Sequence, residues 1–335
     1  MAPLPATSHG AFASSVSAFL RASDFGHQRH ATYKGSHLLL VRSPCACLAL
    51  HLLPTPSCEA EVLPAETSAA LSDAYAARRR GHRKRAPLVH LWQDQWLEHN
   101  AIVCSRLLSM LGRSDRVMAR STTVRRIDAA TIDAFLLENH LWGATKARYR
   151  YGCYSKPDGR LVAVASFSAR WNVRRRGKEQ ADARASHELI RYCSSRGVTV
   201  VGGISKLLAA FTRDASPDEI VTVIDRDWGA GDGWRTLGFT PLKKLPPVTF
   251  FVGPDGLRCH PGAGPNPHRR RLPPQILDDL AASGEQAAPT DDDVESDEAE
   301  AATERFLAAR GYFAVRDAGA ERHLKMVTPV TETVD

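Results

Sequence analysis

The alternation of apolar and polar residues predicts regular structure from about residue 88 onward. Residues 88–92 form a short apolar run that suits a strand, and residues 94–111 place apolar side chains at helical spacing. Residues 124–127 predict another strand, after which Asp128 is a favourable N-cap for a helix. We therefore expect one main domain, located downstream of a long N-terminal region.

A denser pattern lies in the middle of the chain. Residues 149–154 and 161–168 are rich in β-branched and aromatic side chains and flank a Lys-Pro-Asp-Gly turn, which predicts a β-hairpin. Further strands are predicted at 187–193, 219–224 and 248–252, and helices at 205–212 and 232–237. This order predicts an α/β (α+β) fold over residues 121–256, with a central mixed sheet flanked by helices.

The N-terminal region has the composition of a targeting segment. Residues 1–55 contain Ala, Ser, Arg and His freely but a single acid, Asp24. This is typical of a chloroplast or mitochondrial transit peptide, and a disordered N-terminal extension is the other interpretation. We expect residues 1–55 to be unstructured and the protein to be soluble in an organelle. Residues 56–87 form a basic linker, whose run at 78–85 is either an arm that contacts phosphate or a plain spacer.

The C-terminal region and the overall composition exclude several classes of site. Residues 257–302 form a basic and then acidic linker, with seven acids in the ten positions 291–300, and we expect the acidic tract to be disordered. Residues 303–328 form a compact tail motif. The seven cysteines show no paired CxxC spacing and no zinc spacing, so we expect reduced thiols and no metal. No apolar run reaches the roughly 18 residues of a membrane span, so we expect no membrane partner.

Three short stretches resemble the GNAT acetyltransferases. Residues 187–191 (HELIR) are similar to the strand before the cofactor loop of that family, residues 203–208 (GISKLL) to its loop-to-helix turn, and residues 234–239 (WRTLGF) to its terminal signature. The resemblance covers the central third of the chain. It implies a GNAT fold that transfers an acyl group from acetyl-coenzyme A to an amine.

A second resemblance extends beyond this module. Four blocks are similar to phage-type proteins that join a Vsr-like or restriction-like endonuclease domain to a GNAT-like module; they lie at 90–96 (HLWQDQW), 139–143 (NHLWG), 200–207 (VVGGISKL) and 311–319 (GYFAVRDAG). Gln93 stands where the nuclease-like block usually has a carboxylate, and metal-dependent cleavage needs clustered carboxylates. We therefore expect residues 88–120 to be a remnant of the endonuclease-like domain, without nuclease activity.

The GNAT resemblance also implies a donor site. In that fold a glycine turn opens a helix whose free N–H groups and positive dipole end receive the pyrophosphate of coenzyme A. Val200 stands where the family usually has a polar residue, and Lys206 is either a phosphate contact or an exposed surface lysine. The residues assigned to the donor by this resemblance are Gly202, Gly203, Ile204, Ser205 and Lys206.

Catalytic candidates follow from the chemistry of acyl transfer, which needs a base for the amine and an acid for the thiolate. Glu188 is the candidate base, or it is paired with a neighbouring arginine. The family often has a tyrosine acid where this chain has Trp234, whose indole N–H cannot supply a proton. Tyr192 or Tyr154 replaces this acid only if the fold turns it inward. His140 is either a proton shuttle or a hydrogen-bonded structural residue.

A basic stretch after the predicted hairpin favours nucleic acid, because arginine neutralises phosphate while tryptophan stacks on a base. A solvated loop is the other interpretation. The residues concerned are Arg170, Trp171, Arg174, Arg175, Arg176 and Lys178. The net charge of +7 fits such a partner, although many organellar proteins are basic for other reasons.

Two functional hypotheses result. The first is an N-acyltransferase, or its weakened descendant, that acts on or near nucleic acid in an organelle with acetyl-coenzyme A as the donor. The second is a non-catalytic nucleic-acid-binding protein derived from a mobile-element endonuclease. The sequence patterns contain no information on the oligomeric state.

Overall fold

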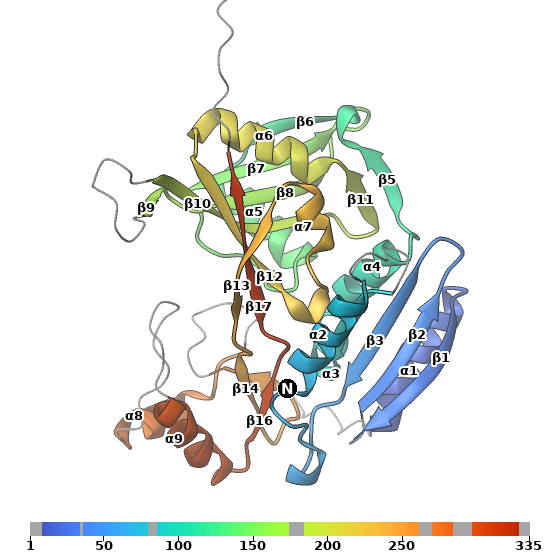
Figure 1. Cartoon of the computed structure of the whole chain (residues 1–335), viewed down its shortest axis with the longest axis vertical. Helices are drawn as coiled ribbons and strands as arrows, with labels where there is room; N and C mark the ends of the chain where they lie inside the picture. The colour runs from blue at the N-terminus through green and yellow to red at the C-terminus, as the bar shows by residue number, and fades with distance from the viewer. Residues whose placement is uncertain are drawn as a thin grey trace, which may run out of the picture. The chain divides into compact units, whose positions relative to one another are not determined.

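The computed structural model describes residues 9–33, 36–79, 86–173, 184–260, 270–283 and 297–327 (Figure 1). The chain divides into two compact units, neither of which is one continuous segment. The first comprises residues 1–103, 226–230 and 246–319, and the second comprises residues 104–225, 231–245 and 320–335. The domain boundaries expected at residues 88, 121 and 257 therefore do not coincide with the division into units.

The second unit is built on a mixed sheet. Among the described residues this sheet has eight strands, in the order β13-β17-β12-β10-β8-β7-β6, with β9 paired to β10. The strands are β6 (Thr122–Arg126), β7 (Tyr149–Ser155), β8 (Leu161–Phe167), β9 (Trp171–Val173), β10 (Arg184–Ser194), β12 (Glu219–Asp225), β13 (Thr240–Leu245) and β17 (Ala320–Met326). Only β10 and β12 pair in parallel. A separate parallel pair joins β5 (Asp115–Met118) to β11 (Val198–Val201).

Helices cover both faces of this sheet. Helix α6 (Gly203–Ala215) crosses one face (Figure 1), where Phe211 stacks on Phe167 of β8 with ring centroids 3.9 Å apart. Helix α5 (Ala129–Asn139) begins after Asp128, whose carboxylate accepts the N–H of Thr131, and packs on the other face around Val164. Complete burial of one such aromatic ring is worth roughly 1.5–3 kcal/mol. The predicted class, a mixed sheet flanked by helices, is confirmed.

The last strand of the predicted domain lies elsewhere. Residues 248–252 were expected to complete the sheet, but β14 (Thr249–Val252) belongs to the first unit and pairs with β15 (Arg258–Cys259) and β16 (Phe313–Arg316). Strand β17, some 75 residues further along than β13, takes the place between β12 and β13. This pairing between distant segments has no signal in the local pattern.

The first unit contains a second sheet, which corrects the expectation for the N-terminus. Helix α1 (His9–Ala22) precedes the strands β1 (Gly26–Tyr33), β2 (Ser36–Arg42) and β3 (Cys47–Leu53), and β4 (Leu88–Trp92) pairs in parallel with β3. Buried leucines at 48, 50, 52 and 53 make β3 a core strand. The prediction of an unstructured segment is therefore wrong for residues 9–33 and 36–53, whereas targeting to an organelle stays a prediction.

The remaining elements of the first unit also replace predicted linkers. Helix α2 (Thr67–Arg79) lies in the segment that was expected to be a basic linker, and α3 (Gln93–Glu98) leads into α4 (Asn100–Met110), whose residues from 104 onward belong to the second unit. Helices α8 (Pro274–Ala282) and α9 (Asp297–Ala308) occupy described parts of the expected C-terminal linker. Residues 297–300 of the acidic tract are helical, and residues 291–296 lie outside the described residues, as do residues 80–85 of the basic run.

Three observations on the described residues concern the predictions about membrane spans and cysteines. None of their helices is long and apolar enough to cross a membrane. All the cysteines are free thiols. Burial raises the pKa of Cys193 and of Cys259 to about 12, so both thiols stay protonated and unreactive.

Candidate active site

The parallel strands β10 and β12 separate part-way along their length. Their paired residues run from Ser186 and Glu219 to Leu189 and Thr222, yet β10 continues to Ser194 and β12 to Asp225. The register of β10 against β8 shifts directly after Leu189, which marks a bulge. At the last pair, the Thr222 hydroxyl donates to the Leu189 carbonyl at 3.0 Å. The carboxyl ends of two neighbouring parallel strands thus diverge, and in α/β sheets ligands bind outside such ends.

The glycine turn lies directly before α6. Gly202 is the N-cap with φ 76°, in the left-handed region that glycine adopts without strain. A Cβ on Gly203 would lie 2.8 Å from Val200 Cγ1 and 3.2 Å from the Tyr192 hydroxyl. Close packing therefore requires glycine at 203. Val200 is buried, which explains why an apolar residue stands where the family usually has a polar one.

Tyr192 points into this turn. Its side chain packs with the core under α6, and a Cβ on Gly203 would lie 3.2 Å from its hydroxyl oxygen. Burial raises the pKa of Tyr192 to about 12, so the phenol is neutral. The structure therefore brings the catalytic candidate Tyr192 together with the turn that carries the donor candidates Gly203 and Ile204.

Lys206 is engaged by the chain itself. Its ammonium donates to the carbonyl oxygens of Ala119, at 2.8 Å, and of Thr122. These bonds tie the first turn of α6 to the start of β6. Ser205 is exposed at the same turn. A phosphate contact by Lys206 stays a prediction, and it requires the exchange of these carbonyl partners for phosphate oxygens.

Glu188 lies on the other face of the sheet. The adjacent residues on β10 face α6, since His187 meets the Phe211 ring at 5.2 Å and Leu189 belongs to the same buried cluster. Side chains alternate along a strand, so Glu188 faces the α5 side and is half-buried there. Its own N–H donates to the Ser168 hydroxyl at 2.8 Å. The structure does not bring Glu188 together with the α6 turn.

The segment after α5 connects the two diverging strands. The Trp142 indole N–H donates to Asp225 Oδ2 on β12 at 3.0 Å, and Arg191 Nε on β10 donates to the Gly143 carbonyl at 3.4 Å. His140 Nδ1 accepts the Trp142 backbone N–H at 3.1 Å, which is a structural role within the loop. We name residues 140–143 the bridging loop.

Arg106 on α4 completes this side of the site. Burial lowers the pKa of its guanidinium, and the neighbouring Asp225 carboxylate opposes that shift. Sequence reasoning missed Arg106, Trp142 and Asp225 as a group. The sequence block at 139–143 singled out the segment that contains Trp142. No local pattern indicates that its hydrogen-bond partner is Asp225, 83 positions further along.

The other predicted residues fall into three groups. Trp234 packs edge-to-face on Phe239, with centroids 5.5 Å apart, as expected of a core residue. Trp171 is 38% exposed on β9, and Arg170 Nε donates to Asn172 at 3.3 Å. The rest of the basic stretch, Arg174, Arg175, Arg176 and Lys178, lies outside the described residues. Within the part of the chain that the structure describes, no group of three or more His, Cys, Asp or Glu side chains could hold a metal ion.

In the first unit, the block at 90–96 has structural contacts. Trp92 donates to Asp227 at 3.0 Å, and Gln93 accepts the Thr55 N–H at 3.3 Å. Asp94, a carboxylate in this block, accepts Arg258 Nε at 2.9 and 3.0 Å. An aspartate held in a buried ion pair is not available to a metal ion.

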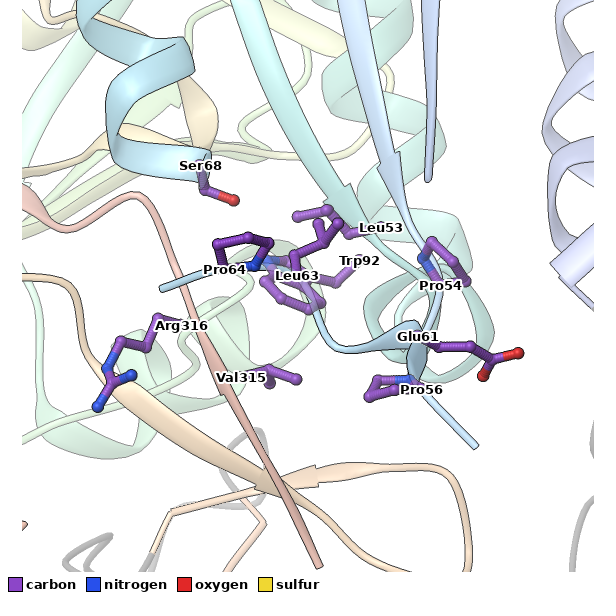
Figure 2. Close-up of a pocket in the computed structure, with 10 residues that line it drawn as sticks. All are labelled: Leu53, Pro54, Pro56, Glu61, Leu63, Pro64, Ser68, Trp92, Val315 and Arg316. Atoms are coloured by element: carbon purple, nitrogen blue, oxygen red, sulfur yellow. The ribbon is translucent and has the colours of Figure 1, made fainter. Parts of the chain in front are cut away.

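A small hollow lies at the carboxyl ends of β3 and β4 (Figure 2). Leu53, Leu63 and Trp92 form much of its lining. Of its charged side chains, Glu61 accepts the Ser57 N–H at 2.8 Å, and Arg316 is paired with acidic residues of α9. The hollow offers apolar surface and no arrangement for acid–base chemistry.

Comparison with known proteins gives distant structural similarity alone. No protein-family model and no curated protein matches the chain. A Corynebacterium glutamicum protein described as histone acetyltransferase HPA2 and related acetyltransferase aligns at TM-score 0.28 and 15% identity, over 46% of this chain and 99% of that chain. The NatC complex bound to Gag peptide and CoA aligns at TM-score 0.27 and 11% identity, over 37% of this chain and 88% of that chain. A mutant AtaT toxin bound to the AtaR C-terminus and acetyl-CoA aligns at TM-score 0.28 and 14% identity, over 37% of this chain and 87% of that chain. At these identities and TM-scores no function is transferred from them.

Proposed function

We propose that the second unit is an acyl-coenzyme A-dependent N-acyltransferase of the GNAT type. The observation that carries this proposal is the divergence of β10 and β12 after Leu189 and Thr222, together with the Gly202–Gly203 turn that opens α6. Diverging parallel strands accommodate an extended arm between them, and a helix N-terminus stabilises a pyrophosphate. Both features belong to one unit and to consecutive segments of it.

The residues of the turn fit a coenzyme A donor. The absence of a Cβ at Gly203 lets the turn pack closely against Val200, and the amides of residues 203–205 are the N-terminal donors of α6. The Tyr192 hydroxyl lies beside Gly203 at this turn, so it must make room for the pyrophosphate of a bound donor. A neutral phenol is a weaker partner than a phosphate, because charge-assisted hydrogen bonds are about twice as strong.

Glu188 remains the proposed base. It lies on the α5 side of β10, the side on which the bridging loop connects the diverging strands. An amine that approached from this side would give up its proton to Glu188, directly or through water. The thiolate would then depart on the opposite, α6 side of the sheet.

We further propose that the acceptor lies on or near nucleic acid and that the enzyme acts in an organelle. The exposed Trp171 beside Arg170 and the net charge of +7 support contact with a polyanion. Replacement of the arginines at 174–176 by alanine is expected to flatten the salt dependence of binding to single-stranded DNA. An unchanged slope in a filter-binding titration would remove this stretch from the interface.

Calorimetric titration of the full chain with acetyl-coenzyme A tests the central proposal. The wild-type protein is expected to bind the donor saturably and to melt at a higher temperature in its presence. Gly203→Val is expected to abolish binding, whereas Gly233→Ala, whose added Cβ has no atom within 4 Å, is the matched control and should bind normally. A folded wild-type protein that shows no binding would refute the proposal.

A further inference from the structure

A buried histidine on β17 has one satisfied and one unsatisfied ring nitrogen. His323 is 0% exposed, and its Nε2 lies 2.7 Å from Glu321 Oε2. Its Nδ1 is buried, and among the described residues it has no hydrogen-bond partner. Buried polar atoms without a partner are rare and costly, so each one needs an explanation, and a catalytic role is among the recognised ones.

His323 lies where β10 and β12 separate. It is the cross-strand partner of Thr222, whose hydroxyl bonds to the Leu189 carbonyl at the last pair of the two strands. Leu189 packs under α6, so Thr222 and His323 share that face of the sheet. A Cβ on Gly231, the N-cap of α7 (Asp232–Thr236), would lie 3.2 Å from His323 Cε1. The backbone at the N-cap of this short helix therefore lies close to the ring.

The carboxylate beside the ring is itself held in place. Arg235 on α7 lies 3.6 Å from Glu321 Oε2 and 3.0 Å from Asp232 Oδ1. A carboxylate on one ring nitrogen orients an imidazole and stabilises its protonated form, which leaves the other nitrogen to exchange the proton. In this arrangement Nδ1 of His323 is the exchanging atom.

We propose that His323 is a catalytic residue of the acyl transfer, the acid that protonates the departing thiolate; this rests on the proposed function. The amine nitrogen forms the new C–N bond to the thioester carbonyl carbon, and its proton leaves on the α5 side through Glu188. The C–S bond breaks, its electron pair goes to sulfur, and the proton on His323 Nδ1 converts the thiolate to a thiol. Solvent then reprotonates the imidazole. Amine and thioester give amide and thiol.

This assignment supplies the acid that the sequence lacks at Trp234. The base Glu188 and the acid His323 lie on opposite faces of the sheet, on the two sides of the separating strands. A purely structural Glu–His pair that holds β17 in register would have the same geometry. The test must therefore separate a proton-transfer role from a packing role.

The control is another buried histidine of the same sheet face. His187 is 1% exposed, and its Nδ1 lies 3.2 Å from the Ser168 carbonyl oxygen. In full-length protein with isotope-labelled histidine, acetyl-coenzyme A is expected to shift the Nδ1 resonance of His323 and not that of His187. The variants His323→Gln and His187→Gln assign the two resonances.

Turnover is measured as thiol release from acetyl-coenzyme A with polylysine as the probe amine. His323→Gln is expected to keep donor affinity, to lower kcat by roughly 10² to 10⁴, and to lose the alkaline fall of kcat that marks the deprotonation of an acid. His187→Gln should keep the wild-type profile.

The outcomes separate this proposal from the function on which it rests. If wild-type protein does not bind acetyl-coenzyme A, the acyltransferase proposal fails and the role of His323 fails with it. If the donor binds but the Nδ1 resonance does not move, or if His323→Gln keeps the wild-type rate and pH profile, the role of His323 is overturned and the acyltransferase proposal stands. An equal decrease of kcat in His323→Gln and His187→Gln would also overturn the proposed role of His323, because it would show that both histidines act through packing.

Discussion

Acidification is expected to destabilise the first unit through a pair of buried histidines. His51 on β3 and His90 on β4 are neighbours in the parallel register, with their Nδ1 atoms 2.8 Å apart, and His90 Nε2 lies 2.9 Å from the Ser72 hydroxyl on α2. The two rings are 4% and 0% exposed. Burial lowers the pKa of His51 to about 4, and burial, His51 and Arg226 together lower the pKa of His90 well below 6.5. Both rings are therefore neutral in the folded state near pH 7.

The sign and size of the effect follow from proton linkage. Below pH 6.5 the unfolded chain binds protons at these rings and the folded chain does not, so the free energy of unfolding decreases as pH falls. The decrease continues until His51 itself titrates in the folded state, at about pH 4. At about 1.4 kcal/mol per pKa unit, His51 alone accounts for roughly 2.5 kcal/mol between about pH 7 and pH 4.5. His90, whose pKa is also lowered in the folded state, decreases the free energy of unfolding further as pH falls.

Urea denaturation at a series of pH values, followed by tryptophan fluorescence and circular dichroism, measures this loss. His51→Gln should be less stable than wild type near neutral pH, because it disturbs the bond to His90, but its stability should fall less steeply on acidification. His30→Gln, at an exposed position on β1, is the matched control and should keep the wild-type slope. An identical pH slope in wild type and His51→Gln would refute the reasoning.

Three further variants test contacts of both units. Asp94→Asn should cost about 3–5 kcal/mol of unfolding free energy, because it leaves the Arg258 guanidinium buried without its charged partner; a loss below about 1 kcal/mol in urea denaturation would contradict this. Trp142→Phe removes the indole N–H that Asp225 accepts together with part of the ring, and should cost about 1–3 kcal/mol without changing the circular dichroism spectrum; unchanged stability would show that the bridging loop is held by other contacts. Tyr192→Phe removes the hydroxyl that lies beside Gly203 at the start of α6 and should tighten acetyl-coenzyme A binding in calorimetry, whereas weaker binding would mean that the hydroxyl contacts the donor.

Local signals in the sequence predicted individual elements of the second unit well. The β-branched and aromatic residues around the Lys-Pro-Asp-Gly turn became β7 and β8, and Asp128 caps α5 through the Thr131 N–H at 2.7 Å. The glycine turn at 202–203 opens α6 as predicted. These features depend on residues within one or two turns of chain, where backbone preference and side-chain capping act directly.

The pairing of distant segments was decided by the tertiary structure. Strand β17, in a segment that was predicted only as a compact tail, enters the sheet between β12 and β13, and the predicted strand at 248–252 leaves it for the first unit as β14. Strand β3 contains His51 and was wrongly assigned to an unstructured segment. The hydrogen-bond partner of His51 is His90 on β4, 39 positions further along, so the local sequence does not reveal it. Burial of a polar residue becomes favourable only once its partner is in place.

The same limit applies to the site. The sequence by itself placed the glycine turn and named Glu188 and Tyr192, because their residue types carry the chemistry wherever they lie. Whether Tyr192 and Glu188 lie on the same face of the sheet depends on the bulge after Leu189 and on the separation of β10 from β12. Both features arise from the pairing of three strands, β8, β10 and β12. A shift of one residue in register moves a side chain to the other face of a sheet, so only the assembled sheet decides that Tyr192 meets α6 and that Glu188 does not.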